Sequence, residues 1–214
     1  MATAYAPGLP LPLRNALAEL VIAALDDDVA AAALAWLVDP AFPIAPAVRE
    51  RLAAVHLVGD DGTLLAVHRP HRDVTHRHAR RGLRAAAAYR RGSAPAERSG
   101  IDQAAAHAVA LWNESLFFEV HEVLEAVWKT ASGPVRQALQ GVIQIGVALH
   151  HHAHGNPRGA RTLMREGRER LLASPGGLPM LDVEGLLAAT AGWEGALAAG
   201  TAGPREPPPL RLAR

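Results

Sequence analysis

Apolar residues recur every three or four positions along most of the chain, and this spacing predicts helices. In the N-terminal part it predicts helices near residues 13–24, 29–38 and 47–55. The period then changes, because two short apolar runs, 56–58 and 63–67, flank the dipeptide Asp61-Gly62, which is typical of hairpin turns. Three helices and one β-hairpin is the order of a winged helix-turn-helix. We therefore expect residues 1–95 to form a small winged-helix-like module that ends in an Arg-rich helix.

The chain after residue 100 keeps the helical period throughout. It predicts five helices, at residues 102–112, 116–129, 135–154, 157–173 and 183–199. We expect these helices to form a bundle over residues 100–200, so the predicted fold class is mainly α. Turn-forming residues from Gly92 to Gly100 mark the boundary between the two parts. The last segment, 201–214, contains four prolines and is expected to be a disordered tail.

The composition excludes several classes of protein. There is no cysteine, which excludes a disulfide framework, a thiol nucleophile and cysteine-ligated zinc or iron, so any metal must be held by His, Asp or Glu. There is no glycine-rich phosphate loop and no serine in a nucleophile elbow, which argues against a kinase, a dehydrogenase or a serine hydrolase. No apolar run approaches the roughly 20 residues of a membrane span, and the N-terminus lacks a basic leader. We expect a cytoplasmic protein with no membrane partner.

The formal net charge of +1 hides a strong asymmetry. Between His68 and Arg98 nine arginines oppose Asp73 and Glu97, a local balance of +7. This band contacts the phosphates of a nucleic acid, is a solvated surface, or pairs with an acidic protein partner such as the acidic helix of the other domain or subunit. The candidate nucleic-acid contacts are two arginines on the helix at the recognition position and four in the band: Arg49, Arg51, Arg77, Arg80, Arg81 and Arg84.

A second candidate site is the polar face of the helix predicted at 116–129. At 100° per residue, five of its side chains fall within an arc of about 120°: Phe118, His121, Glu122, Glu125 and Trp128. On the next helix, Gln140, Gln144 and His151 share one stripe. Antiparallel packing of the two helices would bring these polar stripes face to face.

Two interpretations of this polar face remain open. In the first, the side chains form a buried hydrogen-bonded network that sets the register of the helices. In the second, they hold a divalent metal, with His121, Glu122, Glu125 and His151 as ligands. The chain lacks the paired Glu-x-x-His pattern of di-iron bundles and the His-Glu-x-x-His zinc motif, which favours the network.

Two sequence blocks in this region resemble a known family. The first is the segment 112–128, with Trp112-Asn113, Phe117-Phe118-Glu119, His121-Glu122, Leu124-Glu125 and Trp128. The second comprises Gln140-Gly141-Val142-Ile143-Gln144, then His151, then Gly155-Asn156-Pro157-Arg158-Gly159-Ala160. In this order they resemble the bacterial and archaeal family known as domain of unknown function 309, over about residues 102–175.

This resemblance implies a bundle of about five helices and no established reaction. The chain departs from the family pattern at Trp112, Ser115 and Val120. The resemblance also implies that ten polar or aromatic positions belong to the family pattern: Asn113, Glu119, His121, Glu122, Glu125, Trp128, Gln140, Gln144, His151 and Asn156.

Two functional hypotheses follow. The favoured one is a non-enzymatic binding or regulatory protein, whose N-terminal part contacts nucleic acid and whose bundle binds a protein or a small ligand. The alternative is a metal-dependent enzyme of the hydrolase type, in which the Glu/His face holds a divalent cation and Glu119 acts as general base. No cofactor is established by either. A bundle with so few aromatic residues also favours completing its core as a homodimer, which we add as an expectation.

Overall fold

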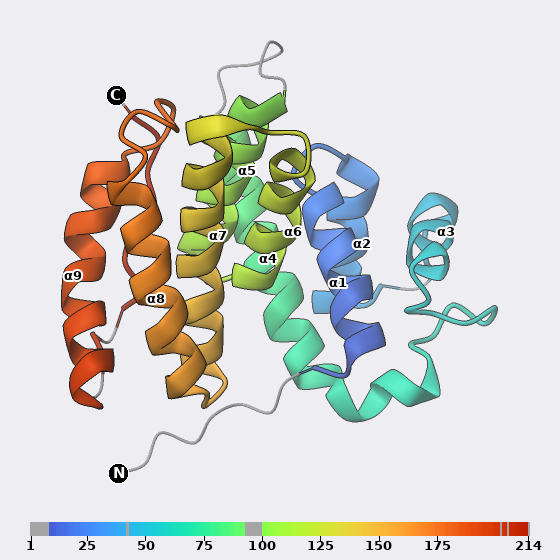
Figure 1. The fold of residues 1–214 in the computed structure, drawn as a ribbon. Helices are drawn as coiled ribbons and strands as arrows, with labels where there is room; N and C mark the ends of the chain where they lie inside the picture. Colours follow the sequence, from blue (N-terminus) through green and yellow to red (C-terminus); the bar gives the residue numbers. More distant parts are fainter. Residues whose placement is uncertain (1–8, 42, 93–99, 202, 205, 214) are drawn as a thin grey trace. The chain divides into compact units, whose positions relative to one another are not determined.

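The structure, a computed structural model, describes residues 9–41, 43–92, 100–201, 203–204 and 206–213 (Figure 1). These residues divide into two compact units, one within Gly8–Ser93 and the other within Ala94–Arg214. They contain no β-strand, only the isolated bridges Val58–Leu64 and Leu181–Leu212, so the prediction of a mainly α fold is confirmed. None of the described helices has both the length and the apolar character that crossing a membrane requires. Residues 93–99, which make up most of the expected boundary, lie outside the described part.

The N-terminal unit is built around a long helix with one face of small residues. Its elements are α1 (Leu11–Ala23), α2 (Asp28–Val38), α3 (Pro46–Ala54), the 3-10 helix η1 (Ala66–His71) and α4 (Arg72–Gly92). Helix α4 packs against both α1 and α2. Gly82 lies at this contact, where a Cβ atom would come within 2.7 Å of Val21 and 3.0 Å of Leu34. The small face therefore lets α4 approach the apolar core closely although the helix carries seven arginines.

The loop between α3 and η1 contains the predicted tight turn. The N–H of Gly62 donates to the carbonyl of Gly59 over 2.9 Å, and the Asp61 carboxylate accepts from the N–H and the hydroxyl of Thr63. These two hydrogen bonds, first the one from the backbone, lower the pKa of the Asp61 carboxyl group.

The prediction of a β-hairpin around this turn is nevertheless wrong. The loop forms a single bridge, between Val58 and Leu64, rather than a ladder of strand pairs. Extended backbone is short on both sides of the turn, because His56 has a left-handed φ of 56° and the chain enters η1 at Ala66. The turn residues specify a local reversal, but the residues that flank it cannot continue as strands.

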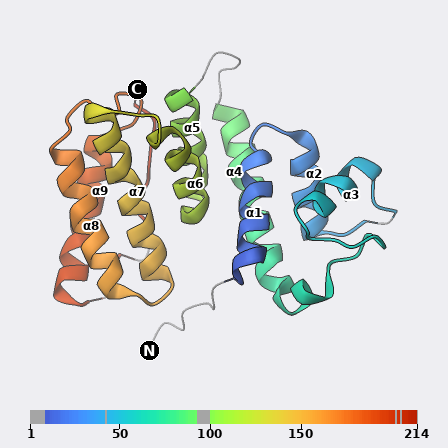
Figure 2. The same ribbon diagram turned by 45° about the vertical axis from the view of Figure 1, so that its right-hand side comes forward.

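The C-terminal unit is a bundle in which each helix packs on the next in the sequence. Its helices, drawn in green to red in Figure 2, are α5 (Gly100–Asn113), α6 (Phe117–Trp128), α7 (Gly133–Ala153), α8 (Pro157–Leu172) and α9 (Val183–Ala199). Two helices start where the sequence carries side-chain caps: Asn156 accepts from the N–H of Gly159, and Asp182 accepts from the N–H of Gly185.

Helices α7 and α8 cross at two glycines. A Cβ atom on Gly141 would lie 2.8 Å from the carbonyl oxygen of Gly167, and a Cβ atom on Gly167 would lie 2.7 Å from that of Gly141. Side chains at either position would push the two backbones apart. The crossing brings Met164 and Leu171 of α8 into the core, where both are almost fully buried.

The C-terminal segment is ordered where the structure describes it, so the expected disorder of residues 201–214 is corrected for 206–213. Leu210 is fully buried, and the Trp112 indole N–H donates to the carbonyl of Pro208 over 2.6 Å. Gly200, with a left-handed φ of 68°, ends α9 and turns the chain back toward the bundle. Prolines favour disorder only when no other interaction fixes the segment. Here buried side chains and backbone hydrogen bonds fix it on the bundle.

The glycine crossing generates a stability prediction. We expect Gly167→Ala to lower the free energy of unfolding by about 1–3 kcal/mol, because the new methyl group overlaps the Gly141 carbonyl. The control is Gly195→Ala in α9, where a Cβ atom meets nothing within 4 Å; higher helix propensity should raise stability there by up to about 1 kcal/mol. Urea denaturation measures both changes. An unchanged Gly167→Ala protein would show that the helices do not cross so closely.

Candidate functional site

Helix α6 has one buried apolar face and one partly exposed polar face. Phe117, Val120, Val123 and Leu124 are buried and hold the helix against its neighbours α5 and α7. The side chains of His121, Glu122 and Glu125 occupy the remaining face and are 32%, 42% and 33% exposed. This partial exposure leaves them accessible to a ligand from solvent.

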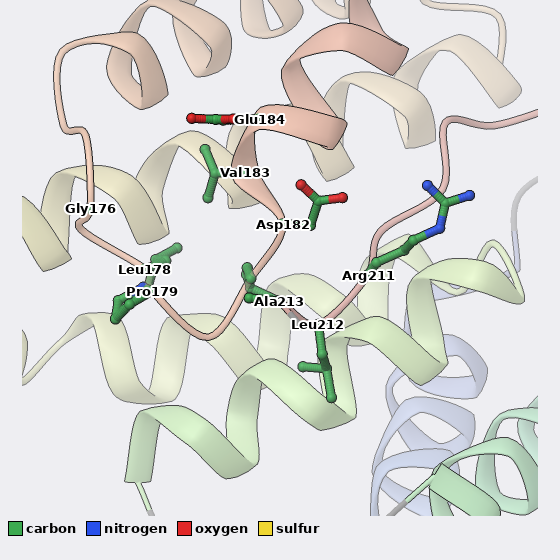
Figure 3. Close-up of a pocket in the computed structure, with 10 residues that line it drawn as sticks. Gly176, Leu178, Pro179, Asp182, Val183, Glu184, Arg211, Leu212 and Ala213 are labelled. Carbon is green, nitrogen blue, oxygen red and sulfur yellow. The ribbon is translucent and has the colours of Figure 1, made fainter.

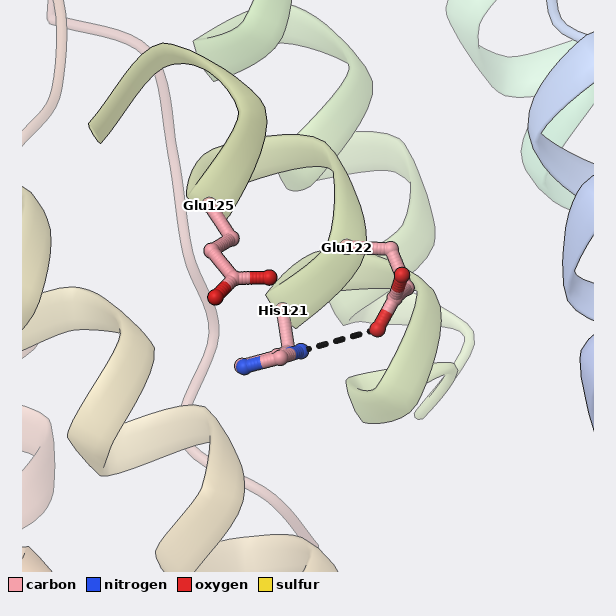
Figure 4. Close-up of side chains that lie close together, drawn as sticks. All are labelled: His121, Glu122 and Glu125. Carbon is pink, nitrogen blue, oxygen red and sulfur yellow. Dashed lines mark hydrogen bonds and ion pairs between the residues drawn. The ribbon is translucent and has the colours of Figure 1, made fainter. Parts of the chain in front are cut away.

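These three side chains form a compact group of candidate metal ligands. One nitrogen of His121 and one carboxylate oxygen from each glutamate lie within 4.8 Å of one another. The imidazole Nδ1 lies 3.1 Å from Oε1 of Glu122, while Glu125 approaches the ring from the other side (Figure 4). The ring of Phe118 stacks beside the imidazole, with the two centroids 6.4 Å apart. The group offers one nitrogen and two oxygen ligands, a set that suits zinc, manganese or iron.

Two neighbours of this group bear on its chemistry. The ammonium of Lys129 lies 3.4 Å from Oε2 of Glu125, so a cation already contacts one of the carboxylates. Glu119, the general base of the enzyme hypothesis, is only 1% exposed and is not a member of the group.

The polar residues of α7 face a different helix from the one expected. Gln144 donates to Glu166 over 3.1 Å and accepts from Arg170 over 2.9 Å, and both partners belong to α8. His151 lies near the start of α8, where its Nδ1 is 3.3 Å from the side-chain Nδ2 of Asn156. In the described residues His151 is therefore not part of the ligand group, and the polar stripe of α7 supports the packing of α7 on α8.

Two further residues of the resembling sequence blocks, Trp128 and Gln140, lie at the end of α6 and on α7. The guanidinium of Arg136 lies 3.9 Å from the centroid of the Trp128 ring and donates to the carbonyls of Trp128, Lys129 and Ala131. This arrangement closes the C-terminus of α6, which gives Trp128 a structural role. Gln140 is half-buried on α7.

The C-terminal end of α5 binds the C-terminal segment, which the sequence did not lead us to expect. Asn113 donates to the carbonyl of Leu210 over 3.0 Å, and its own amide oxygen accepts from the N–H of the same residue over 3.3 Å. With the Trp112 indole, the two residues thus hold the tail by its backbone. The sequence signal for this packed segment is the alternation of apolar Leu210 and Leu212 with Arg211, which is typical of an extended chain with one buried face.

The basic candidate site is a stripe on α4, in the N-terminal unit. Five arginines fall within an arc of about 100° on the face opposite the buried small residues, and all five are exposed. We call these residues the arginine stripe: Arg77, Arg80, Arg81, Arg84 and Arg91. Within the described residues, Arg77, Arg81 and Arg91 have no ion pair, and Arg80 contacts only His76 of the same helix, at 3.4 Å.

Other basic residues of this unit are used to build it. Arg90 donates to the carbonyls of Ala24 and Leu25 and pairs with Asp28 at 2.8 Å, which joins α4 to the connection between α1 and α2. Arg49 donates to the carbonyl of Asp60, and Arg51 is half-buried on α3. The two α3 arginines proposed as recognition residues are therefore less available than the arginine stripe. Arg98, the last residue of the basic band, lies outside the described part.

Comparison with known proteins places the family similarity in the bundle. Residues 105–163, which run from α5 into the first part of α8, match the family "Domain of unknown function (DUF309)". A 49-residue stretch is 45% identical to the uncharacterized protein YpuF of Bacillus subtilis (strain 168), covering 22% of this chain and 28% of that protein. Another, of 56 residues, is 30% identical to an uncharacterized protein of Aquifex aeolicus (strain VF5), covering 26% of this chain and 17% of that protein.

Each matched stretch covers less than a third of the relative's own length. The family match at residues 105–163 contains the α6 ligand group and the end of α5 with Trp112 and Asn113, but neither the arginine stripe nor the tail. No solved structure matches the chain.

The turn that positions α6 generates a stability prediction. Ser115 has a left-handed φ of 57° and ends α5 in a Schellman motif, with the N–H of Leu116 donating to the carbonyl of Leu111. Because a side chain is strained in this conformation, Ser115→Gly should raise the free energy of unfolding by about 1 kcal/mol. Ser132→Gly is the control, since Ser132 has an ordinary φ of −139°. Thermal or urea unfolding would contradict the prediction if Ser115→Gly were destabilising.

Proposed function

We propose that this chain is a non-enzymatic binding protein whose N-terminal unit binds nucleic acid through the arginine stripe of α4. The observation that carries this proposal is the gathering of five exposed arginines on one helix face, opposite the face that packs on α1 and α2. Guanidinium groups bind phosphate oxygens in a bidentate manner, and a row of them binds a polyanion independently of its sequence.

The dimensions of the stripe support this ligand. From Arg77 to Arg91 the helix rises about 21 Å, a length over which one strand of a duplex presents about six phosphates. Asp73, in the first turn, is the only acidic residue of α4, so the field along the stripe stays positive. We propose this contact for α4 rather than for α3, because the Arg49 side chain of α3 already donates to the carbonyl of Asp60, in the loop where the hairpin of a winged helix was expected.

A second candidate function is binding of a divalent cation by His121, Glu122 and Glu125. Ligands that share one ion at about 2.1 Å lie roughly 3–4 Å apart, so atoms within 4.8 Å need only small side-chain rotations to meet around an ion. The contact of Glu122 with the imidazole would orient the ring, as carboxylates commonly do for ligating histidines. The enzyme alternative, a metal-dependent hydrolase, depends on this site.

The nucleic-acid proposal predicts a salt-dependent affinity that comes from the stripe. In the triple variant Arg77→Gln, Arg80→Gln and Arg81→Gln, the slope of log affinity against log salt should fall in magnitude by about 3, roughly 0.9 for each phosphate that the variant no longer neutralises. Fluorescence anisotropy of a labelled duplex, recorded over a series of salt concentrations, measures this slope.

The matched control removes three exposed arginines from α8: Arg158→Gln, Arg161→Gln and Arg165→Gln. It changes the net charge equally, so a specific stripe predicts that the slope stays close to the wild-type value. An equal fall of the slope in both triple variants, or binding of an acidic protein but not of the duplex, would contradict the proposal.

The metal candidate predicts stabilisation by an ion. Adding Zn²⁺ or Mn²⁺ to protein purified without a histidine tag should raise the melting temperature, and His121→Ala or Glu125→Gln should abolish the rise. Glu169→Gln, an exposed glutamate on α8, is the control and should respond like the wild type. A protein that retains no metal in elemental analysis and shows no thermal shift would refute this candidate together with the hydrolase alternative.

A further inference from the structure

The C-terminal segment lies on the bundle like a bound peptide ligand. Along residues 206–213 the burial alternates: Pro208 and Leu210 are buried and Leu212 is half-buried, whereas Pro207, Pro209 and Arg211 are exposed. This period of two is that of an extended chain with one face on its partner. The side chains on the bundle-facing side therefore follow the pattern Pro-x-Leu-x-Leu.

The bundle holds this segment mainly by its backbone. At the α5 end, the Trp112 indole donates to the Pro208 carbonyl, and the Asn113 amide makes two hydrogen bonds with the backbone of Leu210. At the other end, the N–H of Asp182 donates to the Arg211 carbonyl over 3.0 Å, and the N–H of Ala213 donates to the Met180 carbonyl over 2.9 Å. Backbone hydrogen bonds with pockets for alternate side chains are how protein domains recognise extended peptides.

The segment leaves part of this groove unfilled. A pocket of about 660 Å³ opens between the loop before α9 and residues 211–213 (Figure 3). Its lining includes Leu178 and Pro179 from the loop, Glu184 from the first turn of α9, and Leu212 and Ala213 from the tail. A peptide with larger residues than Ala213 at this end would bury more surface than the tail does.

Only one side of the groove lies within the region that matches the family. At the α5 end of the groove, Trp112 and Asn113 lie inside the region that matches the family, whereas the loop before α9 and the tail both come after that match ends at residue 163. The chain returns to the groove through Gly200 and Gly203; a Cβ atom on Gly203 would lie 2.6 Å from the Trp193 ring, so the return path runs close along α9.

We propose that the groove between the end of α5 and the loop before α9 is a peptide-binding site, for an extended segment of a partner protein with the pattern Pro-x-Leu-x-Leu. The chain's own tail occupies this site and competes with the partner. A tethered competitor acts at an effective concentration in the millimolar range, so partner binding stays weak until the tail is released.

The test uses the full chain and a synthetic peptide of residues 206–214. In the variant Leu210→Asp the tail loses its deepest anchor, and the wild-type peptide should bind about 10- to 100-fold more tightly than it binds the wild-type protein. Pro209→Asp is the matched control, because it places the same charge one residue away on the exposed face; its affinity for the peptide should stay at the wild-type level. A peptide that itself carries Leu210→Asp should bind neither protein.

A measurement on the wild-type protein keeps the proposal falsifiable if Leu210→Asp fails to fold. Hydrogen exchange of the Leu210 amide and the Trp112 indole should occur by local release of the tail, at least about 10-fold faster than exchange of buried amides in α7. Exchange of these two groups only at the rate of global unfolding would show that the tail is an integral part of the bundle and overturn the proposal. Failure of the peptide to bind a folded Leu210→Asp protein would do the same.

Discussion

The C-terminal unit depends on one buried hydrogen bond, from the Trp112 indole to the carbonyl of Pro208. Trp112 is 1% exposed, so its N–H would cost free energy if it had no acceptor. The ring lies edge-on to Phe117 and faces Gly146 of α7, where a Cβ atom would come within 3.3 Å of it. Because the acceptor comes from the far end of the chain, a single side chain joins the start of the bundle, its third helix and the tail.

In each unit one helix has a face of charged or polar side chains, because the opposite face of that helix packs against its neighbours. Helix α4 buries Ala, Gly and Thr and needs no large apolar residues, which frees its outer face for the arginine stripe. Helix α6 buries aromatic and aliphatic residues, and its remaining face gathers His121, Glu122 and Glu125. Substitutions on the outer faces are therefore expected to alter binding with little change in folding, which separates functional from structural effects.

The sequence predicted local features well and distant ones poorly. Periodicity identified the helices, and the side-chain caps at Asn156 and Asp182 are equally local, since each depends on residues within one helical turn. Periodicity also placed His121, Glu122 and Glu125 on one face, but it did not specify which helix faces Gln144, because that depends on packing on α8. The order of the tail was not predicted for the same reason: it depends on residues almost 100 positions earlier in the chain.

The preference for arginine over lysine also has a structural use in this chain. Arg136 donates to three carbonyls at the end of α6, and Arg90 joins two carbonyls and a carboxylate, contacts that a single lysine ammonium does not match in geometry. The number of arginines is therefore no measure of nucleic-acid binding, since several of them are needed to build the fold. The functional argument therefore rests on the five residues of the arginine stripe, which are exposed and gathered on one face of α4, and not on the total number of arginines.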